Sequence, residues 1–308
     1  MFIYNLLAKI ARHTPKNILR LRYYKSLQKP LKLNGPLSKA PDLQTYIMRS
    51  LIHNRANGRW ALMADKYAVR DEVSRTIGAE HLIPLYGRWN RAEDIDFDAL
   101  PDEYILKTNN GCGTNVVVHT GHKIDRQAIV QQMSRALHFP YPELSGQLHY
   151  SLIPPAIIAE KLMVQGQGRK SLTDYKIHCV NGVPQVIFVF CDRDEVDHFN
   201  YTVTPYTIRW QIIPPDTKLS DMPADAPVAD DCPECLDQML DMAARLSKGE
   251  EYVRVDFYII GGQIYFGEMT YSPDTRFNAR FDCYQGIFGD ILDKIRSDRV
   301  AGISSTTF

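Results

Sequence analysis

Two alternating apolar runs, each carrying an acidic residue and joined by a Gly-Gly pair, constrain the fold most. They lie in residues 251–273, EYVRVDFYIIGGQIYFGEMTYSP. Gly261 and Gly262 stand where a hairpin has to reverse, so Asp256 and Glu268 are predicted to face each other across paired strands. Acids among Val, Ile, Phe and Tyr are costly unless they are solvated, paired or bound to a cation such as magnesium. The hairpin alone leaves open a solvent-facing acidic pair at a sheet edge.

Composition predicts an ordinary globular protein of two or three lobes. The chain has 308 residues, of which 44% are hydrophobic and 23% charged, with 36 basic and 36 acidic side chains. This balance gives no electrostatic reason to expect nucleic-acid binding. Six cysteines without framework spacing suit a reducing compartment, and the lone pair Cys232 and Cys235 is a weak signal for zinc or redox chemistry.

The amino-terminal arm, residues 1–41, is basic throughout. Nine Lys and Arg residues precede the first acid, Asp42. Its apolar start, Met1 to Ile10, is too short for a membrane span and lacks the basic region that precedes a signal peptide's apolar core. We therefore expect a cytoplasmic protein. A helix packed on the body is favoured for the arm, and peripheral contact with the anionic inner face of the membrane is the second hypothesis.

Residues 42–80 are predicted to be mainly helical. LQTYIMRSLI suits one amphipathic helix, and WALMADKYAVRDEVSRTIG suits a second that closes at Gly78. Lys66 and Arg70, four residues apart, would share one helix face, and such a pair is usually exposed. A short strand and an acidic connection follow in residues 82–100.

A glycine-rich loop between two strands is predicted in YILKTNNGCGTNVVV. The first strand ends in Lys107, and Gly111 and Gly113 allow backbone amides to converge on an anion. The lysine precedes the glycines, so this is not a Walker A loop. A plain hairpin turn is the alternative.

The next segments alternate between helices and strands. Residues 123–138 suit a helix, and PPAIIAEKLM suits a buried strand that ends at Glu160. DYKIHCVNGVPQVIFVFCDRD predicts a hairpin that turns at Asn181 and Gly182. Residues 199–231 are expected to be irregular, and PECLDQMLDMAARLSKG is expected to be a helix closed by Gly249.

Taken in order, these segments resemble the TupA-like branch of the ATP-grasp superfamily. The resemblance covers roughly residues 30–295 and rests on DKYAVRDEV, LIPLYGRW, DIDFDALPDEYILKTNNGCGTN, IIAEKLM, DYKIHCVNG, LSKG, VRVDFY and YFGEMTYSP. It implies an α+β fold in which two α/β lobes clasp ATP between antiparallel sheets, with a helical amino-terminal region. The implied segments are the basic arm 1–41, a helical region 42–100, a lid lobe 101–159 and a carboxyl-terminal lobe with the metal site, 160–308.

The resemblance also implies an ATP site. Lys66 and Lys107 would contact the phosphates, with Lys107 also acting in catalysis. Asp174 would hold the ribose hydroxyls, and Lys176 would serve the phosphates. The loop over the phosphates and the strand at the adenine edge would supply Asn110, Gly111, Cys112, Gly113, Glu160, Lys161, Leu162 and Met163.

The implied metal site lies on the opening hairpin. Asp256 and Glu268 match magnesium ligands, and Arg254 matches a catalytic residue beside the reacting groups. Thr270 stands where the superfamily commonly has Asn, so its role as a third ligand is weaker. Cys112 likewise replaces a small hydroxyl residue.

The implied activity is ATP- and magnesium-dependent joining of a carboxylate to an amine through an acyl phosphate. The branch is associated with bacterial cell-surface polysaccharides, so the substrates would be a uronic acid or an amino sugar, with Asp274, Arg276 and Arg280 as candidate substrate contacts. Two alternatives remain: a glycosyltransferase-like enzyme of polysaccharide assembly, and a non-catalytic nucleotide-binding protein at the membrane.

Overall fold

The computed structural model describes residues 33–302 apart from 166–170, 194–200 and 276–278. These residues form two compact units, each built from segments that are far apart in the sequence. The first contains Leu51–Glu72 and Leu82–Met163, and the second contains 33–50, Val73–His81 and the described residues from Val164 onward. The sequence led us to expect four consecutive segments, and that division stays a prediction. Most of the basic arm, residues 1–32, lies outside the described part.

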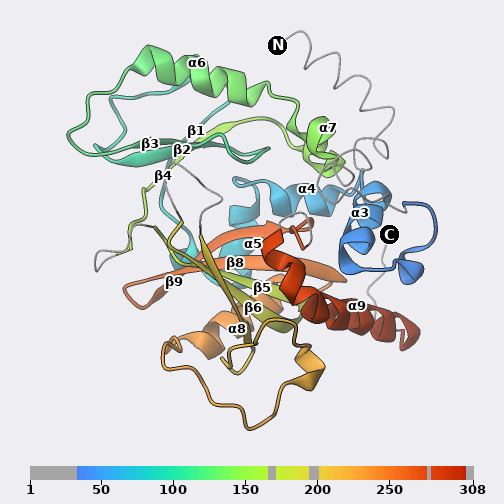
Figure 1. Cartoon of the computed structure of the whole chain (residues 1–308). Helices are drawn as coiled ribbons and strands as arrows, with labels where there is room; N and C mark the ends of the chain where they lie inside the picture. Colours follow the sequence, from blue (N-terminus) through green and yellow to red (C-terminus); the bar gives the residue numbers. More distant parts are fainter. Residues whose placement is uncertain (1–32, 166–170, 194–200, 276–278, 303–308) are drawn as a thin grey trace. The chain divides into compact units, whose positions relative to one another are not determined.

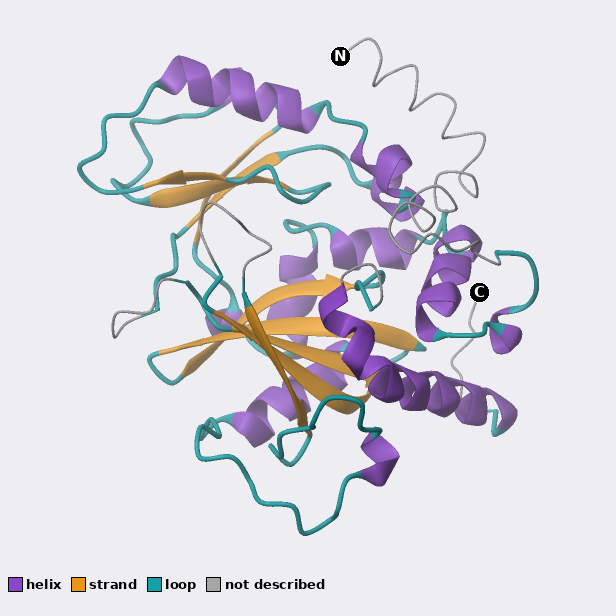
Figure 2. Ribbon diagram, viewed as in Figure 1, coloured by secondary structure: helices purple, strands orange, loops and turns teal. Residues whose placement is uncertain are grey.

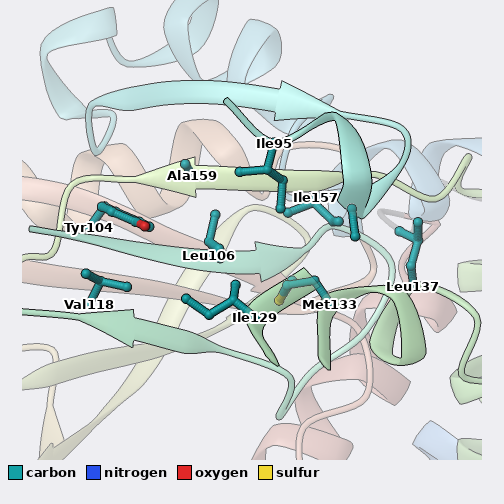
Figure 3. Packing of buried hydrophobic residues seen from close by; sticks show 10 residues of the cluster. Ile95, Tyr104, Leu106, Val118, Ile129, Met133, Leu137, Ile157 and Ala159 are labelled. Carbon is teal, nitrogen blue, oxygen red and sulfur yellow. The ribbon is translucent and has the colours of Figure 1, made fainter. Parts of the chain in front are cut away.

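The first unit contains a four-stranded antiparallel sheet in the order β1-β4-β2-β3. Its strands are β1 (Leu85–Trp89), β2 (Tyr104–Thr108), β3 (Val116–Val118) and β4 (Ile157–Glu160). Helix α6 (Arg126–Leu137) lies along one face of this sheet (Figure 1). Leu106 and Ala159 on the sheet and Met133 on the helix belong to one buried apolar cluster, shown in Figure 3. Because side chains alternate along a strand, Lys107 and Glu160 project from the opposite face.

Two short helices stand where the sequence predicted a single long one. They are α4 (Gly58–Ala64) and α5 (Val69–Thr76), separated by a turn. The carboxylate of Asp65 accepts a hydrogen bond from the Tyr67 amide at 2.8 Å, which ends the first helix and orders the turn. The prediction of one continuous helix is therefore wrong, and Lys66 lies in the turn rather than on a helix face with Arg70.

The second unit contains a five-stranded antiparallel sheet in the order β7-β6-β5-β8-β9. Strands β5 (Asp174–Val180) and β6 (Val183–Cys191) form the predicted hairpin, with φ of 49° at Asn181 and 79° at Gly182. Strands β8 (Tyr252–Ile260) and β9 (Gln263–Thr270) form the hairpin that turns at the glycine pair. Left-handed backbone at both central residues is what a tight two-residue turn requires.

Helices cover both faces of this second sheet (Figure 2). Helix α8 (Leu236–Leu246) buries Met239 and Ala243, and α9 (Gln285–Val300) buries Phe288. Phe288 stacks on Phe188 of β6 at a centroid distance of 5.5 Å. Lys176 projects on the same side of the sheet as α9, because it lies opposite Phe188 in the strand register.

Strand β7 (Thr202–Thr207) corrects the expectation that residues 199–231 are irregular. Pro205 lowers the strand signal in the sequence, but β7 is an edge strand, where a missing amide donor is tolerated. The stacked rings of Tyr206 and Trp210, 4.2 Å apart, anchor the segment that follows.

The remaining described elements are short or lie at the edges of the units. The remaining elements are α3 (Leu43–His53), α7 (Tyr141–Ser145), and the 3-10 helices Leu37–Lys39, Ala79–His81, Ala92–Asp94, Leu148–Leu152, Leu219–Asp221 and Ala279–Tyr284.

None of the described helices has the length and apolar character that crossing a membrane requires.

Candidate active site

Lys107 and Glu160 form an ion pair on the face of the first sheet opposite helix α6. In the strand register Lys107 lies opposite Ile158 and Glu160 lies opposite Ile105, so the two charged side chains are diagonal neighbours. The Lys107 Nζ donates to Glu160 Oε2 at 2.9 Å. The Glu160 side chain is 9% exposed and that of Lys107 is 22% exposed, so the lysine is the more accessible partner.

Arg70 binds the other oxygen of the same carboxylate. Its Nη1 lies 3.3 Å from Glu160 Oε1, and its Nη2 donates to the carbonyl of Ile83 at 2.9 Å. Burial lowers the pKa of the Arg70 guanidinium, and Glu160 acts in the opposite direction. The sequence-based expectation of an exposed Lys66 and Arg70 pair is therefore wrong for Arg70, which is a partly buried ion-pair partner.

The glycine loop is held at both of its ends. Lys66 Nζ donates to the carbonyl of Gly111, and the hydroxyls of Thr108 and Thr114 are 2.9 Å apart. Asn109 ties the loop to its surroundings, because its side-chain Nδ2 donates to Asp65 Oδ1 at 2.9 Å. Lys66 thus contacts the loop through a carbonyl, and contact of Lys66 and the loop with ATP phosphates stays a prediction.

Cys112 is exposed at the tip of the loop. Its Sγ lies 3.2 Å from the hydroxyl of Tyr141, which also accepts a hydrogen bond from the side-chain Nε2 of Gln147 at 2.9 Å. The neighbouring Asn110 is buried, and Gly113 has a φ of 75°, which favours glycine. The four loop residues that the sequence assigned to ATP therefore have different degrees of exposure.

The second unit presents its charged side chains in rows across β5, β8 and β9. Residues opposite each other in the register share one face of the sheet. Lys176, Asp256 and Glu268 form one row, so the predicted facing of the two carboxylates is confirmed. The next row along the strands contains Arg254 and Thr270.

A single guanidinium nitrogen of Arg254 gathers three oxygen-bearing side chains. Its Nη2 lies 2.6 Å from Asp256 Oδ2, 3.3 Å from Glu268 Oε1 and 3.0 Å from the hydroxyl of Thr270. Lys176 Nζ adds a bond of 2.7 Å to Asp256 Oδ2. The predicted metal ligands thus converge on one cationic atom.

Electrostatics keep the Asp256 carboxylate ionised although its side chain is 2% exposed. Burial would raise the pKa of Asp256, but Arg254 and Lys176 outweigh it and hold the pKa at about 2. Burial would likewise lower the pKa of Arg254, and Asp256 reverses that effect and raises it. Each charge in this cluster therefore depends on its partners.

Asp174 lies one row further along the same face, opposite Tyr258. Its Oδ2 is 3.5 Å from Lys176 Nζ and 3.2 Å from Arg193 Nη2. The negative charge of Asp174, together with burial, raises the pKa of Tyr258. Sequence reasoning assigned Asp174 and Lys176 to ATP but gave no role to Arg193 or Tyr258, which flank them.

The oxygen donors of the hairpin fit a magnesium ion in chemical type. Magnesium prefers oxygen ligands and is commonly held by one or two carboxylates together with substrate phosphates. Asp256, Glu268 and Thr270 offer two carboxylates and a hydroxyl around a position that already holds a cationic nitrogen. Across the described ranges no group of three or more His, Cys, Asp and Glu side chains is arranged as a metal site.

The other predicted site residues are less closely tied to these clusters. Lys161, Leu162 and Met163 follow β4, and the Lys161 amide donates to the Pro84 carbonyl at 2.9 Å. Asp274 follows β9, and Arg276 lies outside the described residues.

Arg280 lies beside the ring of Tyr201. It donates to the Tyr201 carbonyl and has its guanidinium carbon 4.7 Å from the centre of that ring. Arg193 approaches the same ring at 5.2 Å. No sequence signal that we used pointed to Tyr201, because it follows a stretch without periodicity.

Comparison with known proteins gives one family and several distant structural likenesses. The model of the TupA-like ATP-grasp family matches residues 45–292, well over half of the chain. No curated protein matches the sequence.

Among solved structures, similarity is found to D-alanine–D-alanine ligase from Bacillus anthracis complexed with ATP. The identity is 15%, the TM-score is 0.45, and the match covers 79% of this chain and 67% of that one. The ATP-grasp ligase PsnB complexed with minimal precursor has 14% identity and a TM-score of 0.42, and the match covers 82% of this chain and 68% of that one. D-Alanine–D-alanine ligase from Helicobacter pylori has 16% identity and a TM-score of 0.39, and the match covers 77% of this chain and 58% of that one.

Proposed function

The chain belongs to the TupA-like ATP-grasp family, and from this premise we propose that it joins a carboxylate to an amine through an acyl phosphate. Membership of the family places it among ATP-dependent ligases. We propose in addition which two chemical groups are joined, which intermediate forms and what the individual residues do.

The observation that carries the proposal is the set of oxygens around Arg254 Nη2. Asp256, Glu268 and Thr270 place oxygen atoms within 3.3 Å of one cationic nitrogen. A group of oxygens that stabilises one cation is chemically suited to another, and phosphoryl transfer from ATP requires a divalent cation beside the phosphates. Asp256 and Glu268, with Thr270, would hold magnesium, which would neutralise charge on the phosphates when bound.

Lys66, Lys107 and the loop between them would bind the phosphates. A lysine acts as a point charge towards a phosphate. Glycine allows backbone conformations in which successive N–H groups point towards one anion. The Lys107 side chain is partly exposed, and Lys66 contacts the loop itself. Movement of the loop would then change the position of a cation and of several amides together.

The proposed reaction has two steps. A carboxylate oxygen of the substrate attacks the γ-phosphorus of ATP, a new oxygen–phosphorus bond forms, and the bond to the β-phosphate oxygen breaks to release ADP. The amine nitrogen then attacks the acyl carbon, loses a proton, and displaces inorganic phosphate to give the amide. Arg254 would stabilise the negative oxygen that develops on the acyl carbon.

We further propose that the substrates are a uronic acid or an amino sugar of a cell-surface polysaccharide. Asp274 and Arg280 follow strand β9 and are candidates to contact these substrates. Arg276, which lies outside the described residues, is a third candidate. Arg280 and Arg193 lie on the ring of Tyr201, so cationic and aromatic groups are available to a sugar acid. Contact of the basic arm with an anionic membrane would suit a lipid-linked acceptor.

Phosphate release from ATP tests the proposal. The purified chain is given ATP and magnesium with a panel of uronic acids, amino acids and amino sugars, singly and in pairs. We expect release only when one compound supplies a carboxylate and another supplies an amine. Release that needs a nucleotide sugar instead, or binding of ATP without release in any combination, would contradict the proposal.

A further inference from the structure

Arg70 has no role in the reaction as described, yet it binds the same carboxylate, that of Glu160, as Lys107 does. The residue belongs to α5, its side chain is 16% exposed, and it bridges Glu160 Oε1 and the Ile83 carbonyl. Glu160 therefore receives a cation on each of its two oxygens, Arg70 on one and Lys107 on the other.

The main chain of Glu160 is held without Arg70. Its Cα is registered opposite Leu85 on one side and Ile105 on the other, at the end of β4. The next residue, Lys161, donates its amide to the Pro84 carbonyl. Arg70 contacts the Glu160 side chain and not this backbone, so its effect is on the direction and charge of the carboxylate.

A carboxylate shared between two cations binds each of them less tightly than a carboxylate with a single partner. The carboxylate attracts each cation, but the two cations repel each other, and this repulsion offsets part of the attraction that holds each one. When one cation leaves, the other prevents the carboxylate from becoming a buried and uncompensated charge, which would be strongly unfavourable. These conditions suit a lysine that has to exchange its carboxylate partner for a phosphate.

We propose that Arg70 is a positioning residue that competes for Glu160 and so keeps Lys107 available to an incoming phosphate. The phosphate in question is that of ATP, so the inference rests on the proposed function for its ligand. The coupling among the three side chains can nevertheless be measured without any ligand. Glu160 is then a relay between two cations, and its side chain need not touch the nucleotide.

Four variants test the coupling: Arg70→Met, Arg70→Lys, Glu160→Gln and the double variant Arg70→Met with Glu160→Gln. Arg75→Met is the matched control, because Arg75 is an exposed arginine on the same helix. The first readout is the rate at which Lys107 is acylated by a lysine-selective reagent, followed by mass spectrometry. The second is the affinity for the ATP analogue AMP-PNP with magnesium, measured by calorimetry.

Loss of Arg70 should let Glu160 hold Lys107 as a one-to-one ion pair. We expect Arg70→Met to slow acylation of Lys107 and to weaken AMP-PNP binding about tenfold, the change that corresponds to about 1.4 kcal/mol. The double variant should recover both, because the neutral amide that replaces the Glu160 carboxylate cannot retain the ammonium. Arg70→Lys keeps the positive charge that competes for Glu160, so both readouts should stay within about threefold of the wild type.

Two outcomes would overturn the inference. One is that Arg70→Met leaves acylation and affinity at the level of Arg75→Met. The other is that Glu160→Gln adds a further loss to Arg70→Met, which is what a merely structural role predicts. If the wild type does not bind AMP-PNP but Lys107 acylation changes as expected, the coupling stands and the proposed function fails.

Discussion

The charged clusters of the two units use similar side chains in opposite arrangements. In the first unit one carboxylate, that of Glu160, lies between the cations Arg70 and Lys107. In the second unit the oxygens of Asp256 and Glu268 surround one cationic nitrogen of Arg254. Cations in excess around a single acid suit the binding of an anion, and oxygens gathered around a cation suit the binding of a metal. This contrast supports our proposal that the first cluster binds the phosphates and the second binds the divalent ion.

The two clusters also differ in how deeply their central groups are buried. Lys107 is 22% exposed, and the Asp256 side chain is 2% exposed. An anionic ligand can therefore replace Glu160 as the partner of Lys107 at little cost in free energy. Asp256, in contrast, cannot lose its partners without leaving a buried charge uncompensated. We expect changes in the first cluster to affect function and changes at Asp256 to affect stability as well.

Truncation of one residue from each cluster should have the largest effect. We expect Lys107→Ala and Glu268→Ala each to reduce ATP-dependent turnover by at least about 100-fold, the scale of a lost transition-state contact. Both side chains are partly exposed, at 22% and 46%, so the fold should be retained. Phosphate release measures the activity and circular dichroism checks the fold. Near-wild-type turnover in either variant would remove that residue from the site.

Breaking the buried pair should give the largest effect on stability. Asp256→Asn leaves Arg254 and Lys176 without their shared counter-charge, and we expect the free energy of unfolding to fall by about 3–5 kcal/mol. Glu268→Gln, whose side chain is 46% exposed, should change it by less than about 1 kcal/mol.

Urea unfolding measured through one tryptophan of the second unit separates these two variants. The chain has three tryptophans, so replacing Trp60 and Trp89 by Phe leaves Trp210 as the reporter. Equal losses for Asp256→Asn and Glu268→Gln would contradict the difference in burial on which the comparison depends.

Acidification should weaken the second unit through His178, which donates to or accepts from the Tyr252 hydroxyl at 2.8 Å. Burial, with help from Arg254, lowers the pKa of His178 from 6.5 to about 3. The unfolded chain therefore binds a proton below pH 6.5 that the folded chain does not bind until about pH 3. Stability is fully present above pH 6.5 and should fall by about 1.4 kcal/mol per pH unit through this window.

Replacing the histidine should reduce that pH dependence. His178→Phe keeps the ring contacts with Phe188 and Phe288 and should lessen the slope of unfolding free energy between about pH 6.5 and about pH 4 by about one proton. An unaltered slope in His178→Phe would show that this imidazole does not stay neutral in the folded chain.

The smallest effect is expected at Thr270. Its hydroxyl donates to Glu268 at 3.1 Å and accepts from Arg254 at 3.0 Å. We expect Thr270→Val to weaken magnesium binding about fivefold, in keeping with one neutral hydrogen-bonding group, and Thr270→Ser to preserve it. Magnesium titration by calorimetry decides this, and equal affinity in the valine variant would exclude Thr270 from the set of metal ligands.

The sequence was most informative where local signals are strong. The family match confirms the ATP-grasp fold and the ligase class. The register confirms that Asp256 faces Glu268, because alternation and a glycine turn together determine which residues are opposite. Strand β7 was missed because Pro205 resembles a strand breaker until the strand is known to lie at an edge.

Contacts between distant segments could not be derived from local patterns. Arg70 and Glu160 are separated by 90 positions, and nothing near either residue indicates the other. The turn at Lys66 had a signal in Asp65, a residue type that competes for backbone amides, but the apolar periodicity on both sides outweighed it. The roles of the individual site residues stay predictions.

Isotope transfer tests the central claim most directly. The carboxylate substrate selected by the phosphate-release screen is labelled with ¹⁸O in its carboxyl group and converted with ATP, magnesium and the amine. Attack of the carboxylate on the γ-phosphorus predicts one ¹⁸O atom in the released inorganic phosphate and the other in the amide product. Label in AMP, or amide formed while the phosphate stays unlabelled, would contradict the acyl-phosphate account.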